Sequence, residues 1–145
     1  MTLAGTRLDL ARVTADTYVL SAREDHIAPW KSAYATVGLL GGDVRFVLTS
    51  SGHIAGIVNP PGPKRRYWTN DTPLPADKGP AADGGPPDSG PDQWLAGAEE
   101  HPGSWWQDWA DWIGSRVGGR RKPPPMGSDA HPPLAAAPGT YVHQT

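Results

Sequence analysis

The 145-residue sequence contains no cysteine, one phenylalanine and two methionines. The absence of cysteine excludes disulfide bonds and thiolate metal sites within the chain, and it removes one of the common catalytic nucleophiles. No stretch approaches the roughly 20 apolar residues of a membrane span, and the N-terminus lacks the long apolar region of a secretory signal. The net charge is only −2, which gives no general attraction to nucleic acid or to an anionic membrane. We therefore expect a cytoplasmic protein that neither spans a membrane nor binds nucleic acid.

Glycine and proline, by contrast, are abundant, with 18 and 17 residues respectively. Most of the prolines follow residue 60, and only the first 60 or so residues have a dense aliphatic pattern. Each ordered residue loses on the order of 1–2 kcal/mol of conformational entropy, and such a short stretch has little apolar surface with which to offset that loss. We expect the chain to fold poorly by itself.

The first half of the chain predicts a strand–helix–strand unit of an α/β fold. Residues 17–21 are a short apolar run typical of a buried parallel strand, and residues 44–49 predict the next strand. Between them, Pro29 opens a helical pattern that Gly41 and Gly42 end. Its apolar positions share one face: Trp30, Ala33, Tyr34, Val37 and Leu40. This order predicts two parallel strands joined by a right-handed crossover.

A carboxylate and an imidazole follow these two strands. Asp25 comes after the first and His53 after the second, so both leave the sheet edge where open α/β sheets place their sites. We expect the two side chains to reach hydrogen-bond distance. In a nucleophile–His–Asp triad the histidine transfers the proton of the nucleophile, and the carboxylate orients the histidine. In α/β-hydrolases the chain order is nucleophile, then acid, then histidine, so Asp25 followed by His53 fits the last two members. The nucleophile itself is absent, since the sequence has no cysteine and no serine in a G-x-S-x-G elbow. An acid and a histidine without their nucleophile predict the C-terminal part of an acyl-transfer enzyme.

Other interpretations of these residues stay open. Asp25 could instead cap the following helix, while His53 bonds to loop backbone. Asp25, His26 and His53 could form a two-histidine, one-carboxylate metal site, although neighbouring side chains such as the first two usually point apart. Gly52 is expected to allow an unusual backbone angle or a close approach.

The second half of the chain is more irregular. Residues 71–92, rich in proline, glycine and aspartate, predict a flexible surface loop. Residues 93–100 predict a short helix. Ser104 and Gln107 form a capping-box pattern for a further helix that ends at Gly118 and Gly119. Its tryptophans fall at helical spacing, which favours core packing over a docking face: Trp105, Trp109 and Trp112.

Several segments in order resemble class I poly(3-hydroxyalkanoate) synthases. The acid segment at residues 23–30 and the histidine segment at residues 51–61 look like those of that family. The similarity continues through four later segments: residues 67–71, 94–101, 103–112 and 137–142. It extends from about Leu8 to Val142, which is nearly the whole chain.

The resemblance implies an α/β-hydrolase catalytic domain that polymerises (R)-3-hydroxyacyl groups, such as 3-hydroxybutyryl, from coenzyme A thioesters with release of CoA. The growing polyester is held on a cysteine. Asp25 matches the catalytic aspartate and His53 the catalytic histidine that would deprotonate this cysteine. Asp25 would orient His53 or assist the attacking 3-hydroxyl. The CoA thioester is the substrate and no cofactor is implied. The implied location is the surface of cytoplasmic polyester granules, with a homodimer or a complementing synthase chain as partner.

Together these observations predict four regions. Residues 1–70 are the C-terminal part of the hydrolase domain, residues 71–92 a loop, residues 93–119 helices of the same domain, and residues 120–145 a proline-rich tail. The segment with the nucleophile is missing, so we expect the chain alone to be inactive. The alternatives are a non-catalytic module whose Trp-rich helix attaches to polyester granules or to an intact synthase, and one half of a split enzyme.

Overall fold

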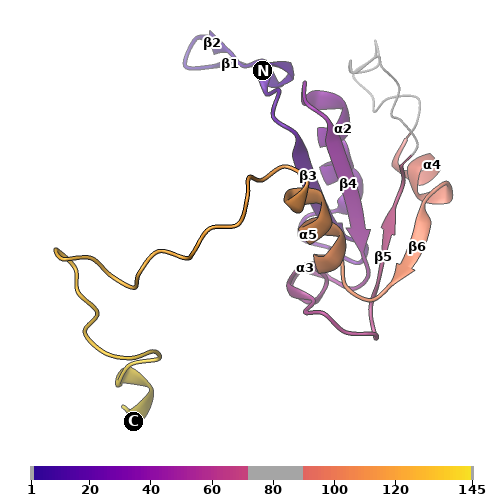
Figure 1. Cartoon of the computed structure of the whole chain (residues 1–145). Helices are drawn as coiled ribbons and strands as arrows, with labels where there is room; N and C mark the ends of the chain where they lie inside the picture. The colour runs from indigo at the N-terminus through magenta and orange to yellow at the C-terminus, as the bar shows by residue number, and fades with distance from the viewer. Residues whose placement is uncertain (1, 72–89, 145) are drawn as a thin grey trace. The chain divides into compact units, whose positions relative to one another are not determined.

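The computed structural model describes residues 2–71 and 90–144 (Figure 1). The chain divides into two units, residues 1–115 and 116–145. Apart from a one-turn 3-10 helix at Leu10–Arg12, the elements of the first unit are β1 (Thr2–Leu3), β2 (Thr6–Arg7), β3 (Thr17–Ala22), α1 (Trp30–Tyr34), α2 (Thr36–Leu39), β4 (Val44–Thr49), α3 (His53–Val58), β5 (Arg66–Thr69), α4 (Pro91–Ala96), β6 (Glu99–Pro102) and α5 (Trp106–Gly114). Most of the loop predicted at residues 71–92 lies outside the described residues.

The centre of the first unit is a four-stranded mixed sheet in the order β3-β4-β5-β6. β3 and β4 are parallel, with Thr17 opposite Val44 and Ala22 opposite Thr49. The other two neighbours, β4 with β5 and β5 with β6, are antiparallel. The fold is therefore mixed α/β, and the two strands predicted in the first half of the chain are present and parallel. β1 and β2 form a separate exposed hairpin.

One face of the sheet is covered by α1, α2 and α4 over an aromatic core. The predicted single helix is two short helices that meet at Ala35. Of its predicted apolar face, Trp30, Tyr34 and Val37 are buried, while Ala33 and Leu40 are half-buried. The core cluster comprises Trp30, Tyr34, Val37, Phe46, Leu48, Trp68 and Trp94. Phe46 is at its centre, with edge-to-face ring contacts at centroid distances of 5.1 Å to Tyr34 and 5.0 Å to Trp94. Such pairs stabilise a core beyond the area they bury.

The helix predicted at residues 93–100 is wrong in its second half. α4 ends at Ala96, and Glu99–Pro102 form the edge strand β6. Glu100 lies opposite Trp68 of β5, and its Oε1 accepts a 2.8 Å hydrogen bond from Nη1 of Arg66. Glutamate favours helices by only a fraction of a kcal/mol per residue. Pairing with a neighbouring strand, which the sequence analysis did not predict, outweighs that preference.

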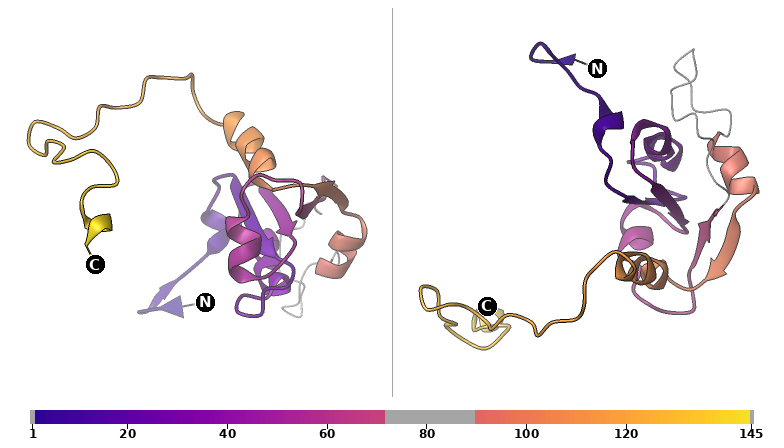
Figure 2. Two further views of the ribbon diagram at one scale, coloured as in Figure 1. Left: turned by 90° about the horizontal axis from the view of Figure 1, so that it is seen from below. Right: turned by 45° about the horizontal axis from the view of Figure 1, so that its top comes forward.

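α5 lies on the other face of the sheet, beside α3 (Figures 1 and 2). A polar cluster joins it to the two parallel strands. Asp108 Oδ2 accepts hydrogen bonds from the Tyr18 hydroxyl at 2.8 Å and from Arg45 Nε at 3.0 Å, and Asp108 Oδ1 accepts from Arg45 Nη2. Burial, together with the bond to Asp108, raises the pKa of Tyr18 above its usual range. The hydroxyl therefore stays protonated and remains a donor.

The prediction that the tryptophan stripe is core is wrong for Trp109. Trp105 and Trp112 are half-buried against Tyr18, with ring centroids 6.4 and 5.4 Å away. Trp109 is 38% exposed, and no residue of α5 is fully buried. Trp109 packs edge-on against the Trp105 and Trp106 rings, with centroids 6.5 Å away, which leaves part of its surface exposed to water.

The capping box at the start of α5 is only half formed. The Ser104 hydroxyl accepts a hydrogen bond from the Trp106 backbone N–H at 3.3 Å. Gln107, however, donates through Nε2 to Asp111 Oδ1 at 3.0 Å, one turn ahead, and does not reach back. The helix also ends at Gly114, four residues before the predicted glycine pair.

The second unit, residues 116–145, has almost no regular structure. Within the described residues 116–144, the one regular element is a 3-10 turn at Tyr141–His143, and residues 116–140 form no helix or strand. In the described parts of the chain, none of the helices has the length and apolar character that crossing a membrane requires.

Candidate active site

The structure brings Asp25 and His53 together. His53 is the first residue of α3, and Asp25 lies in the loop after β3. The parallel register places Ala22 opposite Thr49, so the two loops leave the sheet at the same edge. His53 Nδ1 lies 2.7 Å from Asp25 Oδ2, which is the hydrogen-bond distance that the sequence analysis predicted.

Backbone hydrogen bonds continue the pairing of the two loops beyond the strands. The N–H of Arg23 donates to the Thr49 carbonyl at 2.8 Å, and that of Glu24 donates to the Ser51 carbonyl at 3.0 Å. Ser51 adopts the left-handed backbone region with φ +73°. Gly52 has an ordinary φ of −93°, and an added Cβ would make only ordinary contact, 3.5 Å from the nearest atom. The role expected for Gly52 is therefore wrong, and the unusual backbone angle belongs to its neighbour.

Both oxygens of Asp25 are used. Oδ1 accepts hydrogen bonds from the backbone N–H groups of Ile27 and Ala28, each at 2.8 Å, while Oδ2 faces His53. Asp25 therefore does not cap α1, which begins at Trp30. Its side chain instead closes a local turn ahead of that helix. The side chain is 5% exposed. The Ala28 N–H, with smaller contributions from His53 and Ile27, overcomes the effect of burial and lowers the pKa of Asp25 from 3.8 to about 2.

This geometry determines which nitrogen of His53 can act as a base. An ionised carboxylate only accepts hydrogen bonds, so Nδ1 of the neutral ring carries the proton and Nε2 keeps its lone pair. The His53 side chain is 45% exposed. Within residues 2–71 and 90–144, no group hydrogen-bonds to Nε2. The pair therefore presents an oriented base that is free to take a proton from a nucleophile.

The lowered pKa of Asp25 predicts a pH dependence of stability. A carboxylate whose pKa is lower in the folded state stabilises the fold above its unfolded pKa, about 3.9, and loses this contribution as the pH falls towards the folded value. We expect the difference in unfolding free energy between the wild type and Asp25→Asn to be constant above about pH 5 and to shrink between about pH 4 and 2. Urea unfolding at a series of pH values measures it. Asp111→Asn, on the exposed side of α5, controls for the loss of one charge. A difference in unfolding free energy between the wild type and Asp25→Asn that stays constant down to pH 2 would contradict the prediction.

α3 is packed closely on the sheet through Gly56, which the sequence analysis did not single out. A Cβ at this position would lie 2.8 Å from the Ala22 Cβ and 2.8 Å from the Ser50 carbonyl. Ala22 is fully buried. The buried Thr49 hydroxyl lies 3.0 Å from the Gly56 carbonyl. The sequence did contain a signal for this contact. Gly56 lies inside the short helical pattern after His53, and a glycine in such a pattern often marks a close approach.

We expect Gly56→Ala to destabilise the chain by about 1–3 kcal/mol, the usual cost of overpacking, and to weaken the contact between His53 and Asp25. Both effects follow because α3 must move away from β3 to make room for the methyl group. Chemical unfolding and the NMR signal of the His53 Nδ1 proton measure them. Gly114→Ala is the matched control, since an added Cβ there has no atom within 4 Å. Equal effects of the two substitutions would contradict the role of Gly56.

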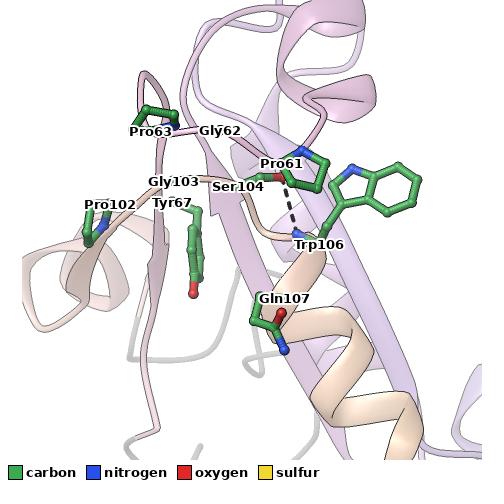
Figure 3. Close-up of a pocket in the computed structure, with 9 residues that line it drawn as sticks. All are labelled: Pro61, Gly62, Pro63, Tyr67, Pro102, Gly103, Ser104, Trp106 and Gln107. Atoms are coloured by element: carbon green, nitrogen blue, oxygen red, sulfur yellow. Dashed lines mark hydrogen bonds between the residues drawn. The ribbon is translucent and has the colours of Figure 1, made fainter.

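An open pocket of about 670 Å³ lies beside the other end of α3. Figure 3 shows nine lining residues, namely Pro61, Gly62, Pro63, Tyr67, Pro102, Gly103, Ser104, Trp106 and Gln107. Neither Asp25 nor His53 is among them. Its lining begins after α3, whereas His53 is the first residue of that helix, so the pocket and the pair are separate features. Among the described residues, no three His, Cys, Asp or Glu side chains form a group that could hold a metal ion.

A histidine oriented by a carboxylate at the carboxyl ends of two parallel strands has the geometry that a nucleophile–His–Asp triad requires of its last two members. Comparison with known proteins shows which family the sequence resembles. The chain is 45% identical over 144 residues to the poly(3-hydroxyalkanoate) polymerase subunit PhaC of Cupriavidus necator. It is 43% identical over 142 residues to a poly(3-hydroxyalkanoate) polymerase of Methylorubrum extorquens, and 40% identical over 141 residues to polymerase 2 of Ectopseudomonas oleovorans. No protein-family model matches it.

The chain belongs to the poly(3-hydroxyalkanoate) polymerase family. The similarity covers 97–98% of its length, and the resemblance described from the sequence motifs is thereby confirmed. The chain spans only 22–23% of the length of these relatives.

Proposed function

We propose that this chain is the C-terminal part of an α/β-hydrolase domain and supplies two members of a Cys–His–Asp triad in a poly(3-hydroxyalkanoate) polymerase. The reaction is the transfer of (R)-3-hydroxyacyl groups from coenzyme A thioesters to a growing polyester. The single observation that supports this most is the 2.7 Å contact between His53 Nδ1 and Asp25 Oδ2, which leaves Nε2 as an oriented base. The names of the relatives support the choice of reaction.

In the proposed reaction, His53 Nε2 takes the proton of a cysteine thiol, and the thiolate attacks the thioester carbonyl. The tetrahedral intermediate collapses, the carbon–sulfur bond to coenzyme A breaks, and CoA leaves as its thiol after taking up the proton. The acyl group is now on the cysteine. Asp25 holds the Nδ1 proton and stabilises the imidazolium while it exists. The coenzyme A thioester is a substrate here, and no cofactor takes part.

The sequence contains no cysteine, so the thiol must come from outside these 145 residues. Purified chain incubated with 3-hydroxybutyryl-CoA should release no CoA. A chimera in which the chain replaces the aligned 144 residues of the Cupriavidus necator polymerase should release CoA and form polyester. Turnover by the chain alone, or an inactive but folded chimera, would overturn the proposal. Co-expression with the remaining part of that polymerase tests the split-enzyme form, in which the partner is a complementing chain.

A second candidate function is attachment to the surface of cytoplasmic polyester granules. The observation that favours it is an exposed apolar surface on α3 and α5, where Ile54 is 73%, Val58 60%, Trp106 41% and Trp109 38% exposed. Co-sedimentation of the chain with poly(3-hydroxybutyrate) granules tests this function. We expect the double variant Ile54→Ser, Trp109→Ser to lose binding if this surface attaches the chain. A second copy of the chain on the same surface would appear as a dimer in light scattering without granules.

A further inference from the structure

The helix that begins with His53 ends in an unusual set of hydrogen bonds. The last carbonyls of a helix have no partner within it and need one elsewhere. Four consecutive carbonyls here, those of Gly56, Ile57, Val58 and Asn59, each meet a side-chain donor from another segment. The donors are Thr49 Oγ1 at 3.0 Å, Trp105 Nε1 at 3.1 Å, Trp106 Nε1 at 3.3 Å and Ser104 Oγ at 2.6 Å, in that order.

Three of these donors are consecutive residues, Ser104 to Trp106, at the start of α5. Ser104 is buried, and its hydroxyl also accepts the Trp106 backbone N–H at 3.3 Å (Figure 3). The Trp105 and Trp106 rings contact each other, with centroids 5.3 Å apart. These three residues are called the tryptophan cap below. The cap itself is fixed in place, because Asp108 on the next turn of α5 is bonded to Arg45 and Tyr18 in the sheet.

The position of His53 depends on how α3 is held. A helix of six residues has little stability by itself, so its contacts decide where its first residue lies. On the sheet side α3 is held at Gly56, and its far end is held by the tryptophan cap. A shift of that end would tilt the helix and change the 2.7 Å distance between His53 and Asp25, which is short enough to be sensitive to small displacements.

We infer that Trp105 and Trp106 are positioning residues, which hold α3 through their indole N–H groups so that His53 stays aligned with Asp25. This inference rests on the proposed function, in which His53 is the catalytic base. The two residues act through the helix and are not assigned any contact with substrate. The N–H groups, and not only the ring surfaces, are what the inference requires.

The test measures the His53–Asp25 hydrogen bond in the full 145-residue chain. The His53 Nδ1 proton and its exchange with water are followed by NMR in the wild type, in Trp105→Phe, in Trp106→Phe and in the double variant. Each lost bond of typical strength should raise the opening rate by roughly 3- to 10-fold, so exchange should quicken stepwise and most in the double variant. Trp109→Phe is the matched control. Its ring lies 6.5 Å from both cap rings, but the N–H groups that bond to α3 carbonyls are those of Trp105 and Trp106, so this variant should leave exchange unchanged.

A second pair of variants separates alignment from folding. 3-Benzothienylalanine at positions 105 and 106 keeps the fused rings and lacks only the N–H donor. Faster exchange with an otherwise unchanged spectrum supports the inference. Unchanged His53 exchange in the folded variant overturns it, and so does global unfolding of this minimal variant, because the bonds would then support the whole fold and not the alignment.

Kinetics of the chimeric polymerase distinguish this inference from the proposed function. The double variant Trp105→Phe, Trp106→Phe should lower kcat by roughly 10-fold with KM nearly unchanged. Gly114→Ala in the same helix, where an added Cβ has no atom within 4 Å, should change neither. If the unmodified chimera is folded and inactive, the proposed function fails, while the NMR result still decides whether the cap aligns His53. If the chimera is active and the double variant keeps full kcat, the cap has no positioning role.

Discussion

His53→Gln in the chimeric polymerase should lower kcat by roughly 10²–10⁴-fold, the range usual for loss of a general base. Glutamine is close in size but has no nitrogen that can take a proton near neutral pH. Asp25→Asn should cause a loss of similar order, because an amide no longer requires Nδ1 to carry the proton and the ring can adopt the wrong tautomer. CoA release from 3-hydroxybutyryl-CoA at saturating substrate measures both losses.

The matched control is His101→Gln. His101 lies in β6, where its Nε2 is 2.8 Å from the Thr69 hydroxyl and its ring stacks on Tyr67. The same chemical change there should leave kcat within a few-fold of the unmodified chimera. The double variant of His53 and Asp25 should be little worse than His53→Gln alone, because residues that act as a unit are not additive. Retention of kcat by His53→Gln would contradict the proposed triad.

The second large effect is on stability. Asp108→Ala should destabilise the chain by about 3 kcal/mol, the lower end of the cost of breaking a buried ion pair, because Arg45 keeps only its 2.9 Å contact with Asp71, whose side chain is 81% exposed. The Asp108 side chain is 12% exposed and that of Arg45 27%, so water can reach Arg45 only in part. The substitution also removes the acceptor of the Tyr18 hydroxyl, which lies 2.8 Å from Asp108. A typical domain is stable by only about 5–15 kcal/mol, so this loss is a large fraction of the total.

Asp92→Ala is the control for that measurement. Its carboxylate pairs with Lys31 at 2.6 Å, but the two side chains are 76% and 53% exposed. Exposed ion pairs contribute about 0–1 kcal/mol, so this variant should unfold almost as the wild type does. Urea unfolding of both variants at neutral pH compares them. An equal loss of unfolding free energy in the two variants would show that Asp108 does not link α5 to the sheet.

Local patterns in the sequence predicted much of the first half of the fold. The apolar runs before Asp25 and before His53 predicted β3 and β4, and a helix between two such runs requires them to be parallel. The helical spacing of Trp30, Tyr34 and Val37 predicted the face that is buried. These features are local, because the period of apolar residues reports which face of an element meets the core.

The later strands were not predictable in the same way. Residues 66–69 contain two aromatic residues and a threonine, which favour a strand, but a preference over only four residues does not predict which strand they pair with. Glu99 and Glu100 favour a helix locally and become a strand through pairing with β5. Strand pairing is a contact between segments far apart in the chain, so local preference does not report it.

The sequence by itself determined the strand–helix–strand unit, the presence of an acid and a histidine at one sheet edge, and membership of the polymerase family, because each depends on residue types and their spacing. Only the tertiary structure decided which oxygen of Asp25 meets His53, that Gly56 allows α3 to approach β3, and that Ser104 to Trp106 cap that helix. These contacts join side chains to backbone groups of other segments. The positions of those groups are set by packing, to within tenths of an ångström, and not by any pattern along the chain.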